Sequence, residues 1–511
     1  MVFKKHIWSF FYWLRLGFQK RIFTFAAKIK TMDKLVGRER EINELDRCMN
    51  SGRSEFVIIY GRRRIGKTFL IRNYFNDNYT FHYVGAHKMT QRQQLENFGK
   101  AIAQYGHLET TPLLDSWSEA FQALENLLTQ NEAERKVIFI DEMPWIDNKQ
   151  SDFVTELEYF WNSWVAMRDD IVFIACGSAT SWMADKIIAN RGGLHNRITR
   201  RIYLAPFTLN ECKQYFDSKN FGWGHYEIIQ CYMALGGVPF YLSLLEPNLS
   251  LPQNIDALFF ENGAKLSGEF DELYYALFPK AERYIATVKA LSAKREGMTR
   301  SELEKATGLT GGNLTKVLKN LERCDFILQY AQFGCKSKYT IFRIADFYTL
   351  FYFKFIENNI TKDTAFWSHN FTTHSVESWE GFTFELVCLK HLNQIKKGLG
   401  ISGIATSASS WRAKAKQTEN ESDTTKGAQI DLVISRVDRL IHLCEIKFSE
   451  KPYTITSAYK EKMNERLEIF RQETKTTHRP VLTMITPYGV AKGKQSWILH
   501  SEITAKDLFS E

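Results

Sequence analysis

The sequence of 511 residues is too long for a single hydrophobic core, so we expect three or four domains of roughly 100 to 200 residues each. Its composition, 44% hydrophobic and 24% charged, is that of an ordinary globular protein and argues against a disordered chain. The net charge of +9 does not by itself indicate a nucleic-acid partner, because residues 1–31 hold seven Lys and Arg and no acidic residue, leaving about +2 elsewhere.

The first 31 residues form a basic aromatic extension whose apolar run, IWSFFYWL, has only about eight residues. A membrane-spanning helix needs about 20, so we predict no transmembrane span, and no small-residue cleavage site indicates a signal peptide. The extension is either a segment lying on a membrane surface or sequence upstream of a true start at Met32, which we favour because ordered patterning begins there. Scattered cysteines without a Cys-x-x-Cys pair predict a cytoplasmic protein without zinc.

Residues 56–60 predict a buried strand, which a loop joins to an apolar-periodic helix beginning at Thr68. The loop fits the pattern G-x-x-x-x-G-K-[ST] with Gly61, Gly66, Lys67 and Thr68. In such a loop the backbone N–H groups surround phosphate oxygens, the lysine neutralises phosphate charge and the hydroxyl reaches Mg²⁺. The motif therefore predicts an ATP site with Mg²⁺. The remaining loop positions are Arg62, Arg63, Arg64 and Ile65, and the three arginines make this site unusually positive.

The segment KVIFIDE, residues 136–142, predicts a central parallel strand that ends in two carboxylates. Ligands of open α/β sheets bind at this edge, so we expect Asp141 to hold the water shell of Mg²⁺ and Glu142 to act as general base in ATP hydrolysis. Helices alternate with further strands in IVFIACGSA and RRIYLAPF, which predicts a parallel sheet. A sensor of the γ-phosphate is expected among Ser178, Thr180 and Ser181.

The loop RGGLHNR lies between the last two predicted strands. Its Arg197 is either an arginine finger for the transferred phosphoryl group or a solvated loop residue. A finger acting in trans would make the chain a homo-oligomer.

Seven segments carry a family resemblance, in chain order VGREREINEL, GRRRIGKT, VIFIDEMPW, IACGSATSWM, GGLHNR, IYLAPF and LGGVPFYL. Together they resemble the archaeal-type ATPase family of the AAA+/STAND group, in a form familiar from gut Bacteroidales, over residues 35–246. The resemblance implies an extra strand between the P-loop strand and the Asp-Glu strand. It also implies that Arg38 lies close to the base, and that Gly237 and Pro239 of a helical lid pack near the adenine.

Residues 282–330 predict three helices, in ERYIATVKALSA, TRSELEKATGL and GGNLTKVLKNLERCDF, and a β-hairpin follows in FILQYAQFGCKSKYTIFRI. Thr299 and Glu302 fit a capping box for the middle helix. Residues 282–340 carry eleven Lys and Arg against six acidic residues, and the third helix exposes Asn313, Lys316 and Lys319. The pattern resembles winged helix-turn-helix domains, which implies contact with double-stranded DNA. The alternative is a module used only for packing.

Residues 427–448 predict a β-hairpin that turns at Asp438, with Asp431 opposite Glu445 and Gln429 opposite Lys447. Two cross-strand carboxylates repel each other unless a divalent cation bridges them, and a nearby lysine can then activate water. By strand alternation these polar residues share one face, and the other face carries Ile430, Leu432, Ile434, Cys444, Ile446 and Phe448.

This D-x13-E-x-K spacing resembles the PD-(D/E)XK nuclease superfamily, and the helix GFTFELVCLKHL supplies Glu385, similar to that superfamily's helix glutamate. The segment IADFYTLFYFKFIE adds a likeness to the domain that commonly follows archaeal-type ATPase modules, so the resemblance covers residues 340–511. It implies a second divalent cation on Glu385, Asp431 and Glu445, with Lys447 in a catalytic role. No proline precedes Asp431, and a degenerate, non-catalytic copy is the alternative.

Residues 407–427 are polar and low in complexity, so we expect an exposed loop. Its basic residues Arg412, Lys414 and Lys416 contact either a phosphate backbone or only solvent.

The chain as a whole is predicted to be α/β. The expected parts are the extension 1–31, a P-loop ATPase core 32–205, a helical lid 206–280, a winged helix 281–345 and a nuclease-like domain 346–511. Two functions follow: an ATP-driven DNA-processing enzyme, or an ATP-gated binding switch whose dead nuclease fold serves for docking. Retention of Asp431, Glu445 and Lys447 favours the first.

Overall fold

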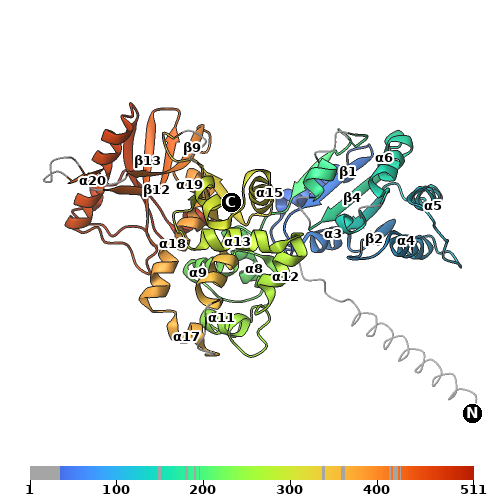
Figure 1. Ribbon diagram of the computed structural model, residues 1–511, viewed down its shortest axis with the longest axis horizontal. Helices are drawn as coiled ribbons and strands as arrows, with labels where there is room; N and C mark the ends of the chain where they lie inside the picture. The colour runs from blue at the N-terminus through green and yellow to red at the C-terminus, as the bar shows by residue number, and fades with distance from the viewer. Residues whose placement is uncertain are drawn as a thin grey trace, which may run out of the picture.

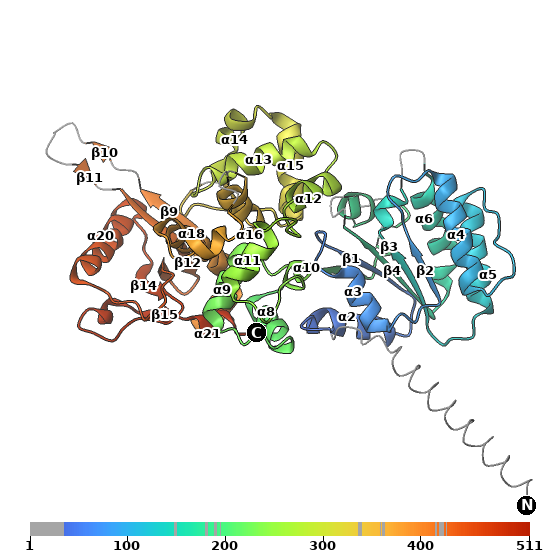
Figure 2. The same ribbon diagram turned by 90° about the horizontal axis from the view of Figure 1, so that it is seen from below.

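The computed structural model describes residues 35–147, 151–178, 182–188, 192–194, 196–335, 340–357, 359, 363–413, 416–417, 424–425 and 427–511. The basic extension, with Met32, lies outside these residues, as do Thr180, Ser181 and Lys414. Two sheets occupy opposite ends of an elongated molecule, and helices fill the middle (Figure 1 and Figure 2). Among the helices that are described, none is both long and apolar enough to cross a bilayer.

The N-terminal sheet has five parallel strands in the order β2-β3-β4-β1-β5. Strand β4 lies between β1 and β3, which confirms the order that the family resemblance implied. Strands β3 and β4 are buried along their whole length, as their unbroken apolar sequences predict for a sheet covered on both faces. The strands are β1 (Glu55–Tyr60), β2 (Phe81–Val84), β3 (Lys136–Asp141), β4 (Ile171–Gly177) and β5 (Arg200–Tyr203).

Helices cover both faces of this sheet, and alternate residues of β1 pack into different cores. Val57 and Ile59 pack with α2 and α3, whereas Phe56 and Ile58 face the cluster of α4, α5 and α6. The helices are α2 (Glu39–Met49), α3 (Lys67–Phe75), α4 (Gln91–Tyr105), α5 (Trp117–Gln130) and α6 (Phe153–Ser163), with short turns η1 (Met143–Trp145), η2 (Val165–Met167) and the π-helical η3 (Met183–Ile188).

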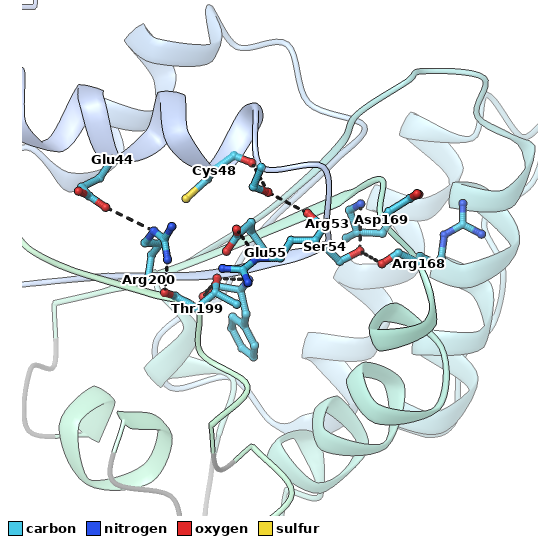
Figure 3. A network of polar contacts seen from close by, with 12 residues as sticks. Glu44, Cys48, Arg53, Ser54, Glu55, Arg168, Asp169, Thr199 and Arg200 are labelled. Atoms are coloured by element: carbon cyan, nitrogen blue, oxygen red, sulfur yellow. Dashed lines mark hydrogen bonds and ion pairs between the residues drawn. The ribbon is translucent and has the colours of Figure 1, made fainter.

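A polar network fixes the amino end of β1 (Figure 3). Glu55 is fully buried, and its carboxylate is 3.0 Å from Arg53 Nε. Burial alone raises the pKa of Glu55, but hydrogen bonds from Thr199 and Arg53 outweigh it, and the net pKa is lowered. Because these contacts lie at the end of β1 opposite the loop 61–66, they stabilise the sheet and leave its carboxyl edge open to ligands.

Five helices form the middle of the molecule after the first sheet. They are α8 (Leu209–Ser218), α9 (His225–Leu235), α10 (Pro239–Leu242), α11 (Leu251–Phe259) and α12 (Glu269–Leu277). Gly237, with φ of +65°, lets the turn before α10 pack closely against the backbone of Phe207. A Cβ at this position would lie 2.4 Å from the carbonyl oxygen of Phe207. The helices share one hydrophobic core with the C-terminal half.

The three helices and two hairpin strands predicted for residues 282–344 are confirmed, and so is the capping box of Thr299 and Glu302. The elements are α13 (Ala281–Ser292), α14 (Arg300–Thr307), α15 (Gly311–Arg323), β7 (Ile327–Tyr330) and β8 (Ile341–Ile344). A short strand that the sequence did not predict, β6 (Met298–Thr299), completes an antiparallel sheet of order β6-β8-β7. Asn313, Lys316 and Lys319 are exposed on α15, as expected.

The C-terminal half is built on a mixed sheet of order β15-β14-β13-β12-β9. Helix α20 packs on its outer face and α18 on the face toward the middle of the molecule (Figure 1 and Figure 2). The strands are β9 (Thr406–Ala413), β12 (Ala428–Arg436), β13 (Leu440–Ile446), β14 (Arg479–Ile485) and β15 (Ser501–Ile503), with a separate short pair β10 (Lys416–Gln417) and β11 (Thr424–Thr425). The helices are α16 (Phe347–Phe351), η5 (Tyr352–Ile356), α17 (Phe366–Asn370), α18 (His374–Lys390), α19 (Leu392–Gly398), α20 (Ser457–Thr474), η6 (Ser496–Ile498) and α21 (Ala505–Leu508).

The exposed loop expected over residues 407–427 is wrong for its first part. Residues 407–413 belong to β9, which pairs antiparallel with β12. Trp411 is 5% exposed and packs on Phe470 of α20 with ring centroids 5.0 Å apart. Ser and Ala occupy most of this strand, so its sequence lacks the alternation of large apolar and polar residues that is typical of a strand.

The predicted hairpin register is confirmed, because Leu432 pairs with Cys444 and Val433 with Leu443. One face assignment is wrong. The pairing of β12 with β9 shifts between Ile430 and Val433, a β-bulge that turns Ile430 into the α20 core instead of the α18 core. Asp431 follows directly, at the bulge.

Candidate active site

The loop after β1 has the conformation of a phosphate cradle. Gly66, with φ of +86°, is the residue before α3, so the unpaired N–H groups of the first helical turn face the loop. A Cβ on Gly61 would lie 2.4 Å from the carbonyl oxygen of Leu204. Lys67 is buried, and its Nζ donates to the carbonyl oxygens of Gly61 at 3.2 Å and Arg62 at 3.0 Å. Burial lowers the pKa of Lys67, and the charges of Glu142 and Asp141 partly oppose this effect.

Thr68 and Asp141 meet at the carboxyl edge of the sheet. The Thr68 hydroxyl donates to Asp141 Oδ2 over 2.7 Å, and Asp141 Oδ1 accepts from the thiol of Cys176 at 2.7 Å. Hydroxyl and carboxylate oxygens are the ligands that Mg²⁺ prefers, so this pair fits the cation that the motif implies.

Glu142 is held in a strained backbone conformation beside the same edge. Its φ is +47°, in the left-handed region that a residue with a Cβ adopts at a cost of roughly 1–3 kcal/mol. Its Oε2 accepts from the backbone N–H of Ser178 at 3.2 Å and from the Ser178 hydroxyl at 2.9 Å. Ser178, the predicted sensor, therefore orients Glu142, whose carboxylate lines the nucleotide cavity.

A cavity of about 450 Å³ opens next to the loop. Arg38 lines it, with its guanidinium 4.6 Å above the Phe207 ring and 3.9 Å from Glu211. Pro239, predicted to lie near the adenine, lines the same cavity, as do the loop residues Arg63, Arg64, Ile65, Gly66, Lys67 and Thr68. The structure thus brings most of the predicted nucleotide-binding residues together.

Two predicted arginines lie elsewhere, and Gly61 and Ser178 do not line the cavity either. Arg62, one of the predicted loop residues, does not line the cavity: its side chain is 2% exposed and its Nη1 lies 2.5 Å from Asp346 Oδ1. Only the backbone of Arg62 remains at the loop. Arg197 is exposed and does not line the cavity of its own chain.

A second cavity of about 730 Å³ lies between residues 294–343 and the C-terminal sheet. Asp431 and Lys447 of the hairpin line it together with Glu385 of α18, whereas Glu445, which was predicted to share the face of Asp431 and Lys447, does not. The remaining wall holds four basic side chains and two acidic ones, namely Lys294, Arg295, Arg343, Arg412, Glu296 and Glu302.

Each of the three carboxylates has its own partner. Glu385 Oε2 is 3.2 Å from Arg343 Nη2, and Asp431 Oδ1 accepts from Gln429 at 3.1 Å. Glu445 accepts from Tyr459 at 2.9 Å and is ion-paired with Arg466.

Among the residues that the structure covers, no group of three or more His, Cys, Asp and Glu side chains could hold a metal. The expected cluster of three carboxylates is therefore not assembled, and Glu385 and Glu445 are each paired with an arginine instead.

The carboxylates in the second cavity still influence one another. Burial raises the pKa of Glu385 to about 7, and the charge of Asp431 adds to the effect. Burial also raises the pKa of Asp431, with Glu445 as the next cause. Arg343 pairs with Glu385 and Arg466 pairs with Glu445, and neither arginine was predicted as a site residue. Both partners are remote in sequence, so a local pattern gave no signal for either.

A P-loop strand, a magnesium-type Thr-Asp pair and a Glu beside the same sheet edge define a P-loop ATPase. Residues 35–245 match the family model described as an ATPase domain predominantly from Archaea, so the chain contains an archaeal-type ATPase domain.

Two curated proteins of Methanocaldococcus jannaschii are similar to the chain. Uncharacterized protein MJECL04 is 24% identical over 365 residues, which cover 71% of this chain and 78% of that protein. Uncharacterized ATP-binding protein MJ0423 is 40% identical over 42 residues, which cover 8% of this chain and 71% of that protein.

Among solved structures, the Walker-type ATPase paby2304 of Pyrococcus abyssi aligns with a TM-score of 0.47 and 18% identity, over 63% of this chain and 96% of that chain. The Aeropyrum pernix ORC2 protein, solved as ADPNP-ADP complexes, aligns with a TM-score of 0.40 and 13% identity, over 70% of this chain and 96% of that chain.

Proposed function

We propose that the chain couples ATP hydrolysis to metal-dependent processing of double-stranded DNA by its C-terminal, nuclease-like part. One observation carries the proposal: Glu385, Asp431 and Lys447 line a single cavity whose remaining wall holds four basic and two acidic side chains. Burial and a neighbouring carboxylate raise the pKa of both Glu385 and Asp431, and perturbed carboxylates in a cleft are a recurring feature of functional sites.

In the ATP step, Lys67 leaves the two loop carbonyls and neutralises phosphate charge, while the N–H groups at the start of α3 donate to phosphate oxygens. Thr68 and Asp141 hold Mg²⁺, which when bound neutralises charge that develops on the phosphates. Glu142, oriented by Ser178, accepts a proton from the attacking water.

The basic helix α15 supports contact with DNA through its first half. Its other end is tied to the ATPase core, because Arg323 Nη1 is 2.8 Å from Asp185 Oδ1 and Lys319 Nζ is 3.9 Å from the same oxygen. Asn313 and Lys316 stay exposed at the amino end, the part of a recognition helix that contacts base edges in winged helix-turn-helix domains. We therefore assign any contact with duplex to this end of α15.

The second candidate is an ATP-gated binding switch whose nuclease-like part only docks. The ion pairs Arg343–Glu385 and Arg466–Glu445 favour this candidate, because each arginine already neutralises a glutamate that would otherwise bind a metal ion.

Cleavage assays on plasmid and linear DNA, with Mg²⁺ or Mn²⁺ and with or without ATP, separate the two candidates. We expect wild-type protein to cleave and Asp431→Asn to be inactive. Asp438→Asn is the matched control, since this aspartate lies in the turn of the same hairpin, is 43% exposed and pairs with Arg436. Cleavage by both Asp431→Asn and Glu445→Gln would contradict the nuclease proposal, and wild-type protein that neither cleaves nor binds Mg²⁺ or Mn²⁺ would favour docking.

A further inference from the structure

A four-residue segment connects the two cavities. Arg343, near the end of β8, pairs with Glu385 in the C-terminal cavity, and Asp346, directly before α16, pairs with Arg62 of the nucleotide loop. The two ion pairs are thus separated by only two residues of chain, Ile344 and Ala345.

The pair at the nucleotide loop is fully enclosed. Both side chains are 2% exposed, and the Arg62 guanidinium lies 4.9 Å above the ring of Phe326. Asp346 Oδ2 accepts from the N–H and hydroxyl of Thr349 at 3.0 Å and 2.6 Å, so both oxygens of the carboxylate are bonded. Moving Arg62 therefore also requires moving Asp346 or leaving one of the two charges buried without its partner.

Arg62 is also bonded to the residue that must move when nucleotide binds. Its carbonyl oxygen accepts from Lys67 Nζ at 3.0 Å, and a phosphate competes for that ammonium group. Nucleotide binding therefore changes the bonding of the Arg62 peptide, whose side chain reaches Asp346.

The segment that joins the two ion pairs is buried and is hydrogen-bonded through its backbone to one carbonyl group. Ile344 and Ala345 are 1% and 2% exposed. The backbone N–H groups of Ala345 and Asp346 donate to the carbonyl oxygen of Phe326 at 2.8 Å and 3.3 Å, and the ring of that residue supports Arg62. Because these residues are closely packed, a displacement of Arg62 also displaces residues 343–346.

The other end of the segment controls the charge in the C-terminal cavity. Arg343 is 6% exposed, and its guanidinium lies 4.4 Å above the Phe382 ring and 3.2 Å from Glu385. Within the described chain, its Nε has no hydrogen-bond partner, so the contact with Glu385 is made through Nη2. Withdrawal of Arg343 would leave Glu385 beside Asp431 without its cation.

We propose that residues 343–346 couple the nucleotide site to the C-terminal cavity. Asp346 is a positioning residue for the nucleotide loop, and nucleotide binding withdraws Arg343 from Glu385. The inference rests on the proposed ATP binding. Coupling between two sites is reciprocal. If nucleotide binding weakens the Arg343–Glu385 pair by a given factor, breaking that pair favours the nucleotide-bound arrangement and tightens nucleotide binding by the same factor.

The test combines two measurements on the full chain with Mg²⁺ and the non-hydrolysable analogue AMP-PNP: binding affinity and hydrogen exchange in α16 and α18. In wild-type protein we expect the analogue to increase exchange in α18 around Glu385. Arg343→Met and Glu385→Gln should each bind the analogue at least about fivefold more tightly, and the double variant no more tightly than either. In Arg343→Met the analogue should no longer change exchange in α18.

Arg295→Met is the matched control, because Arg295 lines the same cavity but is hydrogen-bonded to Ser378 instead of Glu385. Should the buried Arg343→Met fail to fold, Glu385→Gln, at a side chain that is 21% exposed, tests the same prediction. Normal binding with α18 exchange that does not respond to nucleotide would overturn the coupling alone. Absence of AMP-PNP binding to wild-type protein would overturn both the coupling and the proposed ATP binding.

Discussion

The hydroxyl of Thr68, in the first turn of α3, donates to a carboxylate oxygen of Asp141 over 2.7 Å, although β1, which precedes α3, and β3, which ends at Asp141, are separated by β4. Because parallel strands end at the same edge, the loop after β1 and the end of β3 converge there. Two motifs 73 residues apart in sequence thereby form a single oxygen pair for Mg²⁺.

Lys67 and Glu142 have separable roles in ATP hydrolysis. Lys67→Ala should abolish ATP binding, because the phosphates lose their buried positive partner. Glu142→Gln should bind ATP but hydrolyse it about 10²- to 10⁴-fold more slowly, since the general base is lost. Nucleotide titration and turnover measured on each variant separate the effects, with Lys213→Ala, on the exposed face of α8, as control. Wild-type turnover by Glu142→Gln would show that another group accepts the proton.

Arg197 is exposed and lies outside the nucleotide cavity of its own chain, so a role as arginine finger requires a second copy. If it acts in trans, ATP hydrolysis should rise more than linearly with protein concentration. Mixing Arg197→Ala with Lys67→Ala should restore activity, because each chain supplies what the other lacks. A monomer whose rate is linear in concentration would exclude this role.

Asp431→Asn should slightly stabilise the metal-free protein, by no more than about 1 kcal/mol. Burial and the neighbouring Glu445 raise the pKa of Asp431, so both destabilise its charged form in the folded protein, and a neutral amide removes this cost. ATP hydrolysis should persist, because Asp431 does not line the nucleotide cavity. Melting temperature in chelator and ATPase rate check this, and a lower melting temperature would mean that Asp431 stabilises the fold.

The stability of the protein should fall between about pH 4.5 and pH 7 partly because of Glu380. This side chain is 7% exposed and accepts one hydrogen bond, from Gln230. Burial raises its pKa from 4.5 to about 7, and the charges of Glu450 and Glu377 add to the effect.

A carboxyl with a raised pKa contributes stability that is complete below its unfolded pKa and is lost as pH rises through the folded value. Glu380→Gln should therefore gain on the order of 1–3 kcal/mol over wild type at pH 8 and nothing at pH 4. Denaturant unfolding at both pH values measures the difference. Glu227→Gln is the control, because Glu227 is exposed and lines the same surface groove as Glu380. Equal gains at both pH values would show that the effect is not titration of Glu380.

The central strands β1, β3 and β4 could be predicted because they are unbroken apolar runs, two of which end in motifs at Gly61 and Asp141, whereas the short edge strand β2 was not predicted. The hairpin register could also be predicted, since one turn fixes every pair in an antiparallel ladder. The bulge at Ile430 could not, because it arises where β12 meets β9, a Ser- and Ala-rich strand that carries little β signal.

The contacts of Arg62 were also beyond the sequence. Its partner Asp346 is 284 residues away, and the motif GRRRIGKT predicted only that Arg62 belongs to a positively charged nucleotide loop. The same holds for Arg343, whose partner Glu385 belongs to a helix 42 residues further on. Long-range ion pairs of this kind are set by packing of whole segments, and periodicity carries no information about them.

Seven of the eight cysteines are buried, and Cys335 alone is exposed, on the wall of the C-terminal cavity. Thiol-reactive dyes should therefore label the folded native chain at one position without any engineered cysteine removal. A fluorophore there would sit beside the carboxylates and arginines of the cavity, where its emission could follow nucleotide binding and DNA binding in real time.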